Sequence, residues 1–167
     1  NDNDNFYIKD KLITNRELIS YLNLYKKDKV LEISFERNKY FEQICNYIKN
    51  KRGLFLTVDY GYKKNIENYT LQAIQNHKFS NILENIGNKD ISSHVNFDEF
   101  LKIAKKYKLK IDEFCTQREF LIKYGILERK RYLSQKNNSK IIEGELNKLI
   151  NNNEMGKLFK FLIISNL

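Results

Sequence analysis

The feature that most constrains the fold of this chain is the segment Gly-Leu-Phe-Leu-Thr-Val-Asp-Tyr-Gly at residues 53–61. Its residues 54–58 are an uninterrupted run of apolar or β-branched side chains, which is typical of a strand buried on both faces. The run stops at Asp59, Tyr60 and Gly61. Ligands of open α/β sheets bind just outside the carboxyl ends of the strands. The segment therefore predicts a buried strand with a functional site at its end.

Helical and extended patterns alternate along the rest of the chain. An apolar stripe at three- to four-residue spacing predicts a helix over residues 37–51, which leads directly into the strand at 54–58 as in a parallel crossover unit. Asn96 with Glu99 and Thr116 with Glu119 have the form of helix starts, and Gly125 of a helix end. The other expected elements are a strand and short helix within 13–24, strands at 30–34, 110–115 and 158–165, an extended segment at 70–77, a loop at 87–95, and helices at 97–107, 126–135 and 139–151. This order predicts an α/β fold.

Composition limits the classes of function. The net charge of +9 suggests a nucleic-acid partner, but it comes from 24 lysines and only 6 arginines. Surfaces that bind phosphate usually rely on the planar fork of arginine, so compositional drift toward lysine is favoured over functional basicity. Cys45 and Cys115 are far apart and lack ligand-like neighbours, which predicts free thiols and no metal site.

The usual cofactor and membrane signatures are missing from the sequence. It contains no G-x-G-x-x-G, no Walker A loop, no His-Glu-x-x-His and no nucleophile-elbow serine. It also contains no apolar run near the roughly 18 residues of a membrane span. Because the chain starts without Met, we expect it to be part of a longer intracellular protein.

Six short motifs then follow one another along the chain. They are Asp59-Tyr60-Gly61; Thr70-Leu71-Gln72-Ala73 with His77; Gly87 with Asp90-Ile91-Ser92; Val95-Asn96-Phe97; Thr116-Gln117 with Phe120-Leu121 and Gly125-Ile126; and Met155-Gly156 with Phe159-Lys160. In this order and spacing they resemble the C-terminal half of the MidA-like S-adenosylmethionine-dependent methyltransferases. The resemblance covers residues 30–167 and leaves 1–29 as a poorly recognisable lead-in. Asn96 stands where the family has Asp, and Ser92 where it has Thr.

The resemblance implies a fold, a cofactor and partners. The fold is the C-terminal portion of a Rossmann-like class I methyltransferase with added helices. The cofactor is S-adenosylmethionine, bound mainly outside this chain because the family's glycine-rich loop is absent. The partners are a protein substrate and the missing N-terminal half, and the isolated chain is expected to be inactive. The mitochondrial member of the family is a complex I assembly factor that dimethylates an arginine, which implies a mitochondrial protein in a eukaryote and a cytoplasmic one in a bacterium.

Roles follow for individual residues. An arginine acceptor is cationic, so Asp59 is the candidate to hold its guanidinium. His77 is a candidate proton relay, and Asp90 a candidate to orient it. Asp59 could equally cap a nearby loop, and His77 could be a structural hydrogen bonder. The residues expected to line the substrate cleft are Tyr60, Gly61 and His94.

Two other functions stay open at this point. The chain could be an inactive remnant or scaffold that keeps the fold without catalysis. It could also be a basic nucleic-acid-binding domain, which predicts steeply salt-dependent binding. A methyltransferase acting on nucleic acid would combine these interpretations.

Overall fold

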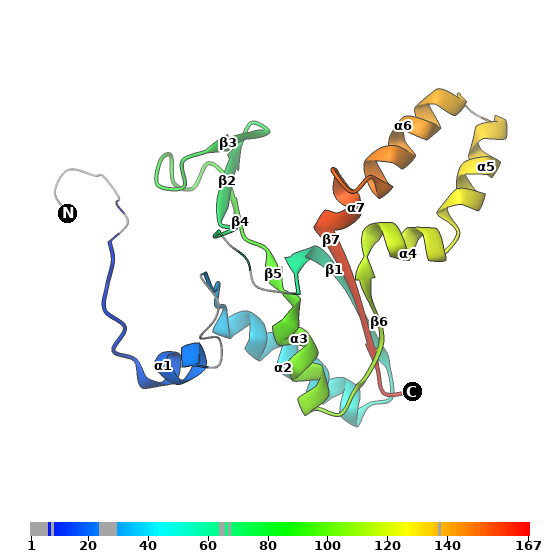
Figure 1. Ribbon diagram of the computed structural model, residues 1–167. Helices are drawn as coiled ribbons and strands as arrows, with labels where there is room; N and C mark the ends of the chain where they lie inside the picture. The colour runs from blue at the N-terminus through cyan, green and yellow to red at the C-terminus, as the bar shows by residue number, and fades with distance from the viewer. Residues whose placement is uncertain (1–6, 8, 24–29, 64–65, 67, 137) are drawn as a thin grey trace. The chain divides into compact units, whose positions relative to one another are not determined.

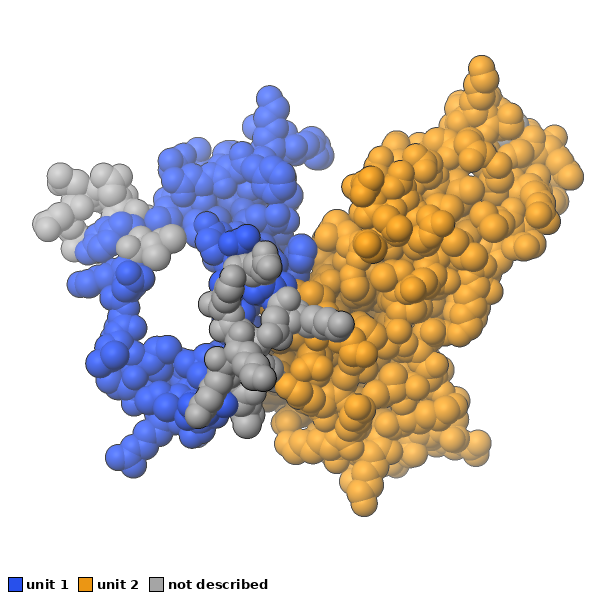
Figure 2. Space-filling view, in the orientation of Figure 1, with its two compact units in different colours: residues 1–33, 64–94 blue, residues 34–63, 95–167 orange. Residues whose placement is uncertain are grey.

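The chain forms two compact units (Figures 1 and 2). The structure is a computed structural model that describes residues 7, 9–23, 30–63, 66, 68–136 and 138–167. Unit 1 comprises residues 1–33 and 64–94, and unit 2 comprises residues 34–63 and 95–167. Part of the expected lead-in at 1–29 lies outside the described residues.

Unit 2 is built on a four-stranded sheet. Its strands are β1 (Leu54–Tyr62), β5 (Val95–Asn96), β6 (Lys110–Thr116) and β7 (Phe159–Ser165), in the order β5-β1-β7-β6. β7 runs antiparallel to both neighbours, and β5 pairs with β1 in parallel at only two positions. The α/β class is thus confirmed. The main partner of β1, however, is an antiparallel strand and not the parallel one that the crossover pattern predicted.

Two helices cover one face of this sheet. They are α2 (Phe35–Asn50) and α3 (Phe97–Lys106), both close to the predicted ranges. Their apolar stripes meet where the rings of Phe41 and Phe100 stack at 4.0 Å between centroids. Leu162 and Ile164 of β7 complete this core from the sheet side, and both are fully buried. Burial of this cluster is the main stabilising term of unit 2.

The opposite face of the sheet is covered only in part. α4 (Gln117–Lys123) begins with the predicted capping box, in which the Thr116 and Glu119 side chains each bond the other residue's backbone. Phe120 of α4 stacks on Phe161 of β7 at 4.0 Å between ring centroids. Gly125 follows α4 with a φ of +90°, as a helix-ending glycine does. The chain continues through α5 (Ile126–Lys136), α6 (Ser139–Ile150) and the short α7 (Met155–Leu158) into β7.

The prediction that the first strand is buried on both faces is wrong for this chain. Its side chains alternate, so that Phe55 packs against the core while Leu54, Leu56 and Val58 are exposed. On the face that carries Leu54, Leu56 and Val58, Phe120 of α4 covers Phe161 of β7 but these three side chains of β1 are exposed.

Unit 1 holds helix α1 (Arg16–Asn23) and a three-stranded antiparallel sheet in the order β3-β2-β4. The strands are β2 (Gln72–Gln75), β3 (Lys78–Ser80) and β4 (Asp90–Ser92). The loop predicted at 87–95 is therefore wrong in part, since β4 lies within it and β5 (Val95–Asn96) begins at its last residue. The strand predicted at 30–34 is reduced to one isolated bridge between Val30 and Ile66. Among the described residues, no helix combines the length and apolarity needed to cross a membrane.

Candidate functional site

The carboxyl end of β1 presents the motif that the sequence singled out. Asp59 is exposed, and its Oδ1 accepts a hydrogen bond of 2.8 Å from the backbone N–H of Tyr60. The Tyr60 ring lies on the other face of the strand, 4.2 Å from the Phe159 ring between centroids. The two side chains thus point to opposite faces of the sheet and cannot line a single groove on one of them.

Asp59 lines a groove between α2, α3 and β1. The groove has a volume of about 270 Å³ and is lined by Arg37, Tyr40, Phe41, Ile44, Phe55, Thr57, Asp59, Val95 and Phe100. Arg37 holds its guanidinium 5.7 Å from the centroid of the Phe100 ring, within cation–π range. The groove therefore combines a carboxylate with aromatic walls, a setting that suits a cationic, planar group. Sequence analysis did not identify Arg37 or Tyr40 as candidate site residues. They line the same groove as Asp59 only because α2 packs beside β1.

Lys160 is the cross-strand neighbour of Asp59. Its amine donates to the carbonyl oxygens of Lys157 and Leu158 at the end of α7. Burial lowers the pKa of Lys160, and the Glu119 carboxylate opposes that shift. The carboxyl end of β1 thus has a cation beside its carboxylate that is already engaged with backbone carbonyls.

Gly61 is buried, and packing explains why glycine stands there. A Cβ at this position would lie 2.5 Å from carbons of the Phe97 ring and 2.6 Å from the carbonyl oxygen of Val95. Both obstacles belong to the core of unit 2. Close packing therefore accounts for the glycine at position 61. A role of Gly61 in a substrate cleft stays a prediction.

His77 lies at the tip of the β2–β3 hairpin in unit 1. Gln75 pairs with Lys78, so Asn76 and His77 form a two-residue turn, with φ values of +52° and +61°. Two positive φ angles are the mark of a type I′ turn, in which glycine is the usual second residue. His77 is exposed, and its positive φ angle is less favourable for histidine than for glycine.

Asp90 and His94 also belong to unit 1. Asp90 is exposed on β4 in register with Ile74, three residues before His77. The described residues include no hydrogen bond or ion pair between Asp90 and His77, so the orienting role of Asp90 stays a prediction. His94 is half-buried, and its backbone N–H donates to the Thr70 hydroxyl at 2.8 Å.

The carboxylate of Glu32, which sequence analysis missed, bonds residues that precede β2. Glu32 accepts hydrogen bonds from the Thr70 N–H at 2.6 Å, the Thr70 hydroxyl at 2.5 Å and the Leu71 N–H at 3.1 Å. The partners are 38 and 39 residues away in the sequence, so no local signal could have found them. Glu32, Leu71 and Phe79 also line a groove of about 670 Å³ in this unit.

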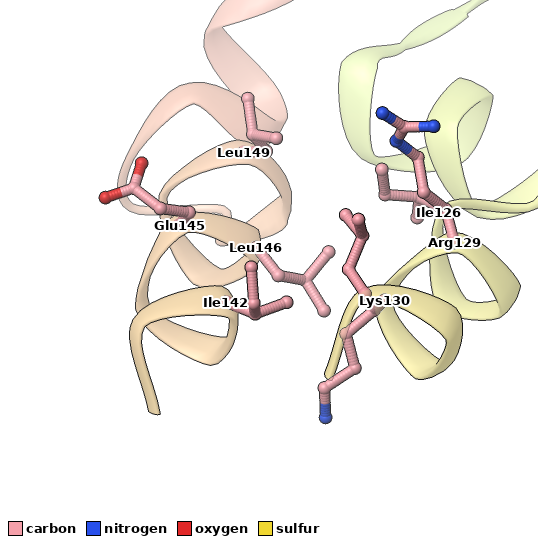
Figure 3. Close-up of a pocket in the computed structure, with 8 residues that line it drawn as sticks. Ile126, Arg129, Lys130, Ile142, Glu145, Leu146 and Leu149 are labelled. Atoms are coloured by element: carbon pink, nitrogen blue, oxygen red, sulfur yellow. The ribbon is translucent and has the colours of Figure 1, made fainter. Parts of the chain in front are cut away.

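A third cavity lies within the helical hairpin of α5 and α6 (Figure 3). It measures about 130 Å³, and Leu146 points from α6 into the gap while Ile126 faces it from α5. An ion pair between Lys130 and Glu143 links the two helices. This gap is a packing space of the hairpin and holds none of the predicted site residues.

The predicted residues therefore divide between the two units. Asp59, Tyr60 and Gly61 belong to unit 2, whereas His77, Asp90 and His94 belong to unit 1. The described residues contain no group of three or more His, Cys, Asp or Glu side chains that could hold a metal ion.

The part of the chain that the structure describes does not contain the glycine cradle with which many dinucleotide- and nucleoside-binding folds bind a cofactor. Gly61 and Gly156 are packed against protein atoms, and neither leaves space for a ligand against its backbone. Gly87 and Gly144 lie in open surroundings, without a strand–turn–helix arrangement around them. Among the described residues, the glycines therefore form no such cradle for the nucleoside end of S-adenosylmethionine.

Comparison with known proteins places these features in a family. The family model described as "Putative S-adenosyl-L-methionine-dependent methyltransferase" matches residues 1–115. Protein arginine methyltransferase NDUFAF7 homolog, mitochondrial, of Caenorhabditis elegans is 36% identical over 104 residues, which are 62% of this chain and 24% of that protein. Protein arginine methyltransferase NDUFAF7, mitochondrial, of Danio rerio is 26% identical over 161 residues, covering 93% and 38%. The chain thus spans less than half the length of these relatives.

Solved structures match the fold of the chain. A COG1565 superfamily protein from Burkholderia thailandensis superposes with a TM-score of 0.85 at 20% identity, over 99% of this chain and 47% of that one. A superfamily member from the same organism bound to S-adenosyl-homocysteine gives a TM-score of 0.83 at 20% identity, over 99% and 45%. The mixed α/β fold described above therefore matches part of the fold of these two structures.

Proposed function

Because this chain belongs to the S-adenosyl-L-methionine-dependent methyltransferase family, we propose that it forms the acceptor-binding part of a protein arginine methyltransferase. The observation that carries the proposal is Asp59 at the end of β1, lining a groove with aromatic walls. Two curated relatives that bear the name protein arginine methyltransferase support arginine as the acceptor. The donor, S-adenosylmethionine, binds mainly to polypeptide outside this chain.

Asp59 holds the acceptor in this proposal. A carboxylate and a guanidinium form two parallel charge-assisted hydrogen bonds, which set both the position and the plane of the group. Phe55 and Phe100 supply apolar walls that keep water from the reacting nitrogen. The guanidinium of Arg37 above the Phe100 ring is an intramolecular example of this kind of group against that wall.

In unit 1, the proposed functional residues are His77, Asp90 and His94. Methylation of an arginine nitrogen releases one proton, and His77 is the proposed group that accepts it. The positive φ of His77 supports a role for its imidazole, since glycine would form the same turn at less cost. Asp90 and His94 are proposed to act with His77, and Tyr60 and Gly61 are proposed to line the acceptor site at the end of β1, Tyr60 from the face opposite Asp59.

Methyl transfer by the product of the complete reading frame that encodes this chain tests the function. The assay uses radiolabelled S-adenosylmethionine and arginine-containing peptides, with Asp59→Asn as the variant. Loss of one charged hydrogen-bond partner predicts a fall in kcat/KM of about 10- to 100-fold. Asp112→Asn is the matched control, because Asp112 is also exposed in unit 2 but pairs with Lys110 on β6. Equal activity of Asp59→Asn and the control would remove Asp59 from the site.

A second experiment tests the proposal that S-adenosylmethionine binds mainly outside this chain. The isolated chain should show no binding of S-adenosylmethionine by calorimetry up to about 100 μM, a limit set by a Kd well above micromolar. Micromolar binding would refute the proposal that the donor site lies elsewhere. A complete product that binds the cofactor but methylates no protein would instead favour the non-catalytic scaffold.

The family resemblance also suggests a cellular setting. We propose a mitochondrial protein connected with assembly of respiratory complex I if the source is a eukaryote, and a cytoplasmic one if it is a bacterium. The two curated relatives above carry the word mitochondrial in their names. Cell fractionation with an antibody against this chain checks the location.

A further inference from the structure

The groove that Asp59 lines carries charges of both signs. Arg37 belongs to the first turn of α2 and Asp59 to the end of β1. Among the described residues that line the groove, no other side chain is charged. Tyr40 and Thr57 contribute hydroxyl groups, and the other lining residues are apolar. A ligand of this groove therefore meets one cation and one anion within about 270 Å³.

Arg37 is held in place by two neighbouring elements. Its backbone N–H donates to the hydroxyl of Ser34, the N-cap of α2, at 3.4 Å. Its guanidinium lies 5.7 Å from the centroid of the Phe100 ring on α3. The residue is half-buried between these elements. The cation is thus a fixed part of the groove and acts on any charged group that binds there.

An acceptor that brings only positive charge fits this groove poorly. The guanidinium of the acceptor is attracted by Asp59 and repelled by Arg37, whose charge has the same sign. A carboxylate next to the acceptor arginine removes the conflict, because it pairs with Arg37 while the arginine pairs with Asp59. Both pairs have the fork geometry in which a guanidinium binds a carboxylate through two parallel hydrogen bonds.

We propose that Arg37 determines acceptor specificity, by selecting segments in which a carboxylate lies within two residues of the arginine to be methylated. The inference rests on the proposed function, in which this groove binds the acceptor. Side chains two positions apart in an extended segment point to the same side, about 7 Å from each other, so both can enter one groove. Arg37 acts on binding of the acceptor and takes no part in methyl transfer itself.

A pair of peptides tests the selection. Each peptide has a single arginine, with glutamate two residues away in one and glutamine in the other. The product of the complete reading frame methylates both with radiolabelled S-adenosylmethionine. The KM of the glutamate peptide should be at least about fivefold lower, with similar kcat, because the ion pair with Arg37 forms on binding and is kept during transfer. Equal KM values for the two peptides overturn the proposal.

Reversal of the charge gives a sharper test. Arg37→Glu should prefer a peptide with lysine in place of glutamate, whereas Arg37→Lys should keep the original preference. Arg37 is the third residue of α2 after its Ser34 cap, where glutamate favours a helix start, so the reversed variant keeps this helix. Should it nevertheless fail to fold, Arg37→Gln removes the charge without reversing it, and should lose the preference.

Lys39→Glu is the matched control. Lys39 also belongs to α2 and is exposed, but it does not line the groove, and its replacement changes the net charge by the same amount. This variant should keep the preference for the glutamate peptide. A preference that Lys39→Glu abolishes as fully as Arg37→Glu would reflect overall charge and overturn the proposal, as would an Arg37→Glu variant that still prefers glutamate.

Peptide binding without S-adenosylmethionine separates the inference from its premise. Fluorescence anisotropy of the labelled peptides gives Kd values for the same proteins. A preference for glutamate that Arg37→Glu reverses, in a product that transfers no methyl group, supports selection by Arg37 and rejects the proposed function. Methyl transfer to both peptides with equal KM and equal Kd rejects selection by Arg37 alone.

Discussion

Substitution of Gly61 by alanine should destabilise unit 2 through steric overlap. The added methyl group would lie 2.5 Å from the Phe97 ring and 2.6 Å from the carbonyl oxygen of Val95. The Phe97 side chain is fully buried, and the Val95 carbonyl belongs to the strand that pairs with β1 at Gly61. Neither group can therefore move away from the added methyl group without disturbing the packing of the core. Overpacking of this kind costs about 1–3 kcal/mol, and with two rigid obstacles we expect a loss of about 2–3 kcal/mol.

The measurement is urea unfolding of the 167-residue chain. The midpoint should fall while the slope of the free energy against urea stays constant, which shows a change in stability and not in the unfolded state. Gly144→Ala is the matched control, because nothing lies within 4 Å of its added Cβ on α6. Removing a glycine from a helix interior should raise the free energy of unfolding by about 0.5–1 kcal/mol, opposite in sign.

A loss below about 0.5 kcal/mol for Gly61→Ala would refute the steric reasoning, since surface-like substitutions fall within that range. A double-mutant cycle locates the clash. Phe97→Leu alone should destabilise unit 2, but together with Gly61→Ala the total loss should be smaller than the sum of the two. Additive losses would mean that the Val95 carbonyl, and not the ring, is the obstacle.

Three further predictions concern the hairpin, a helix cap and a thiol. His77→Gly should stabilise unit 1 by up to about 1 kcal/mol in thermal melts, because glycine adopts positive φ freely, yet abolish methyl transfer by the complete product; full activity would rule out proton transfer by His77. Thr116→Ala should cost about 1 kcal/mol in urea unfolding by removing the cap of α4, and a cost near zero would show that the capping box is not stabilising. Burial, with a smaller contribution from Glu42, raises the pKa of Cys45 from 9.0 to about 12, so the native state keeps a proton that the unfolded state loses. The free energy of unfolding should therefore fall as the pH rises from 9 toward 12, less steeply in Cys45→Ala; equal pH profiles of the two proteins would contradict this.

The helices were predictable because their signals are local. Thr116 with Glu119 and Asn96 with Asp98 form their caps between residues two or three positions apart. Gly125 ends α4 through its own φ angle. The order of the short motifs could also be recognised from the sequence alone. The family match confirms the resemblance that these motifs, starting at Asp59, indicated.

In the sheet of unit 1, β2 lies within the extended segment predicted at 70–77, whereas β3 and β4 were missed for a physical reason. Its strands are three or four residues long, too short for an alternating pattern to stand out. The turn between β2 and β3 is Asn76-His77, without the glycine that usually identifies a type I′ hairpin. The contact of Glu32 with Thr70 joins residues 38 positions apart, which no periodicity can reveal.

By itself, the amino-acid sequence determined that β1 exists and that it ends in a carboxylate, because these properties depend on side chains within a few positions of one another. Only the tertiary structure decided that β7 runs antiparallel beside β1, that the Asp59 groove includes residues of α2, and that Leu54, Leu56 and Val58 are exposed. Strand partners and burial depend on which distant segments meet, and no pattern within residues 54–58 shows which segments those are.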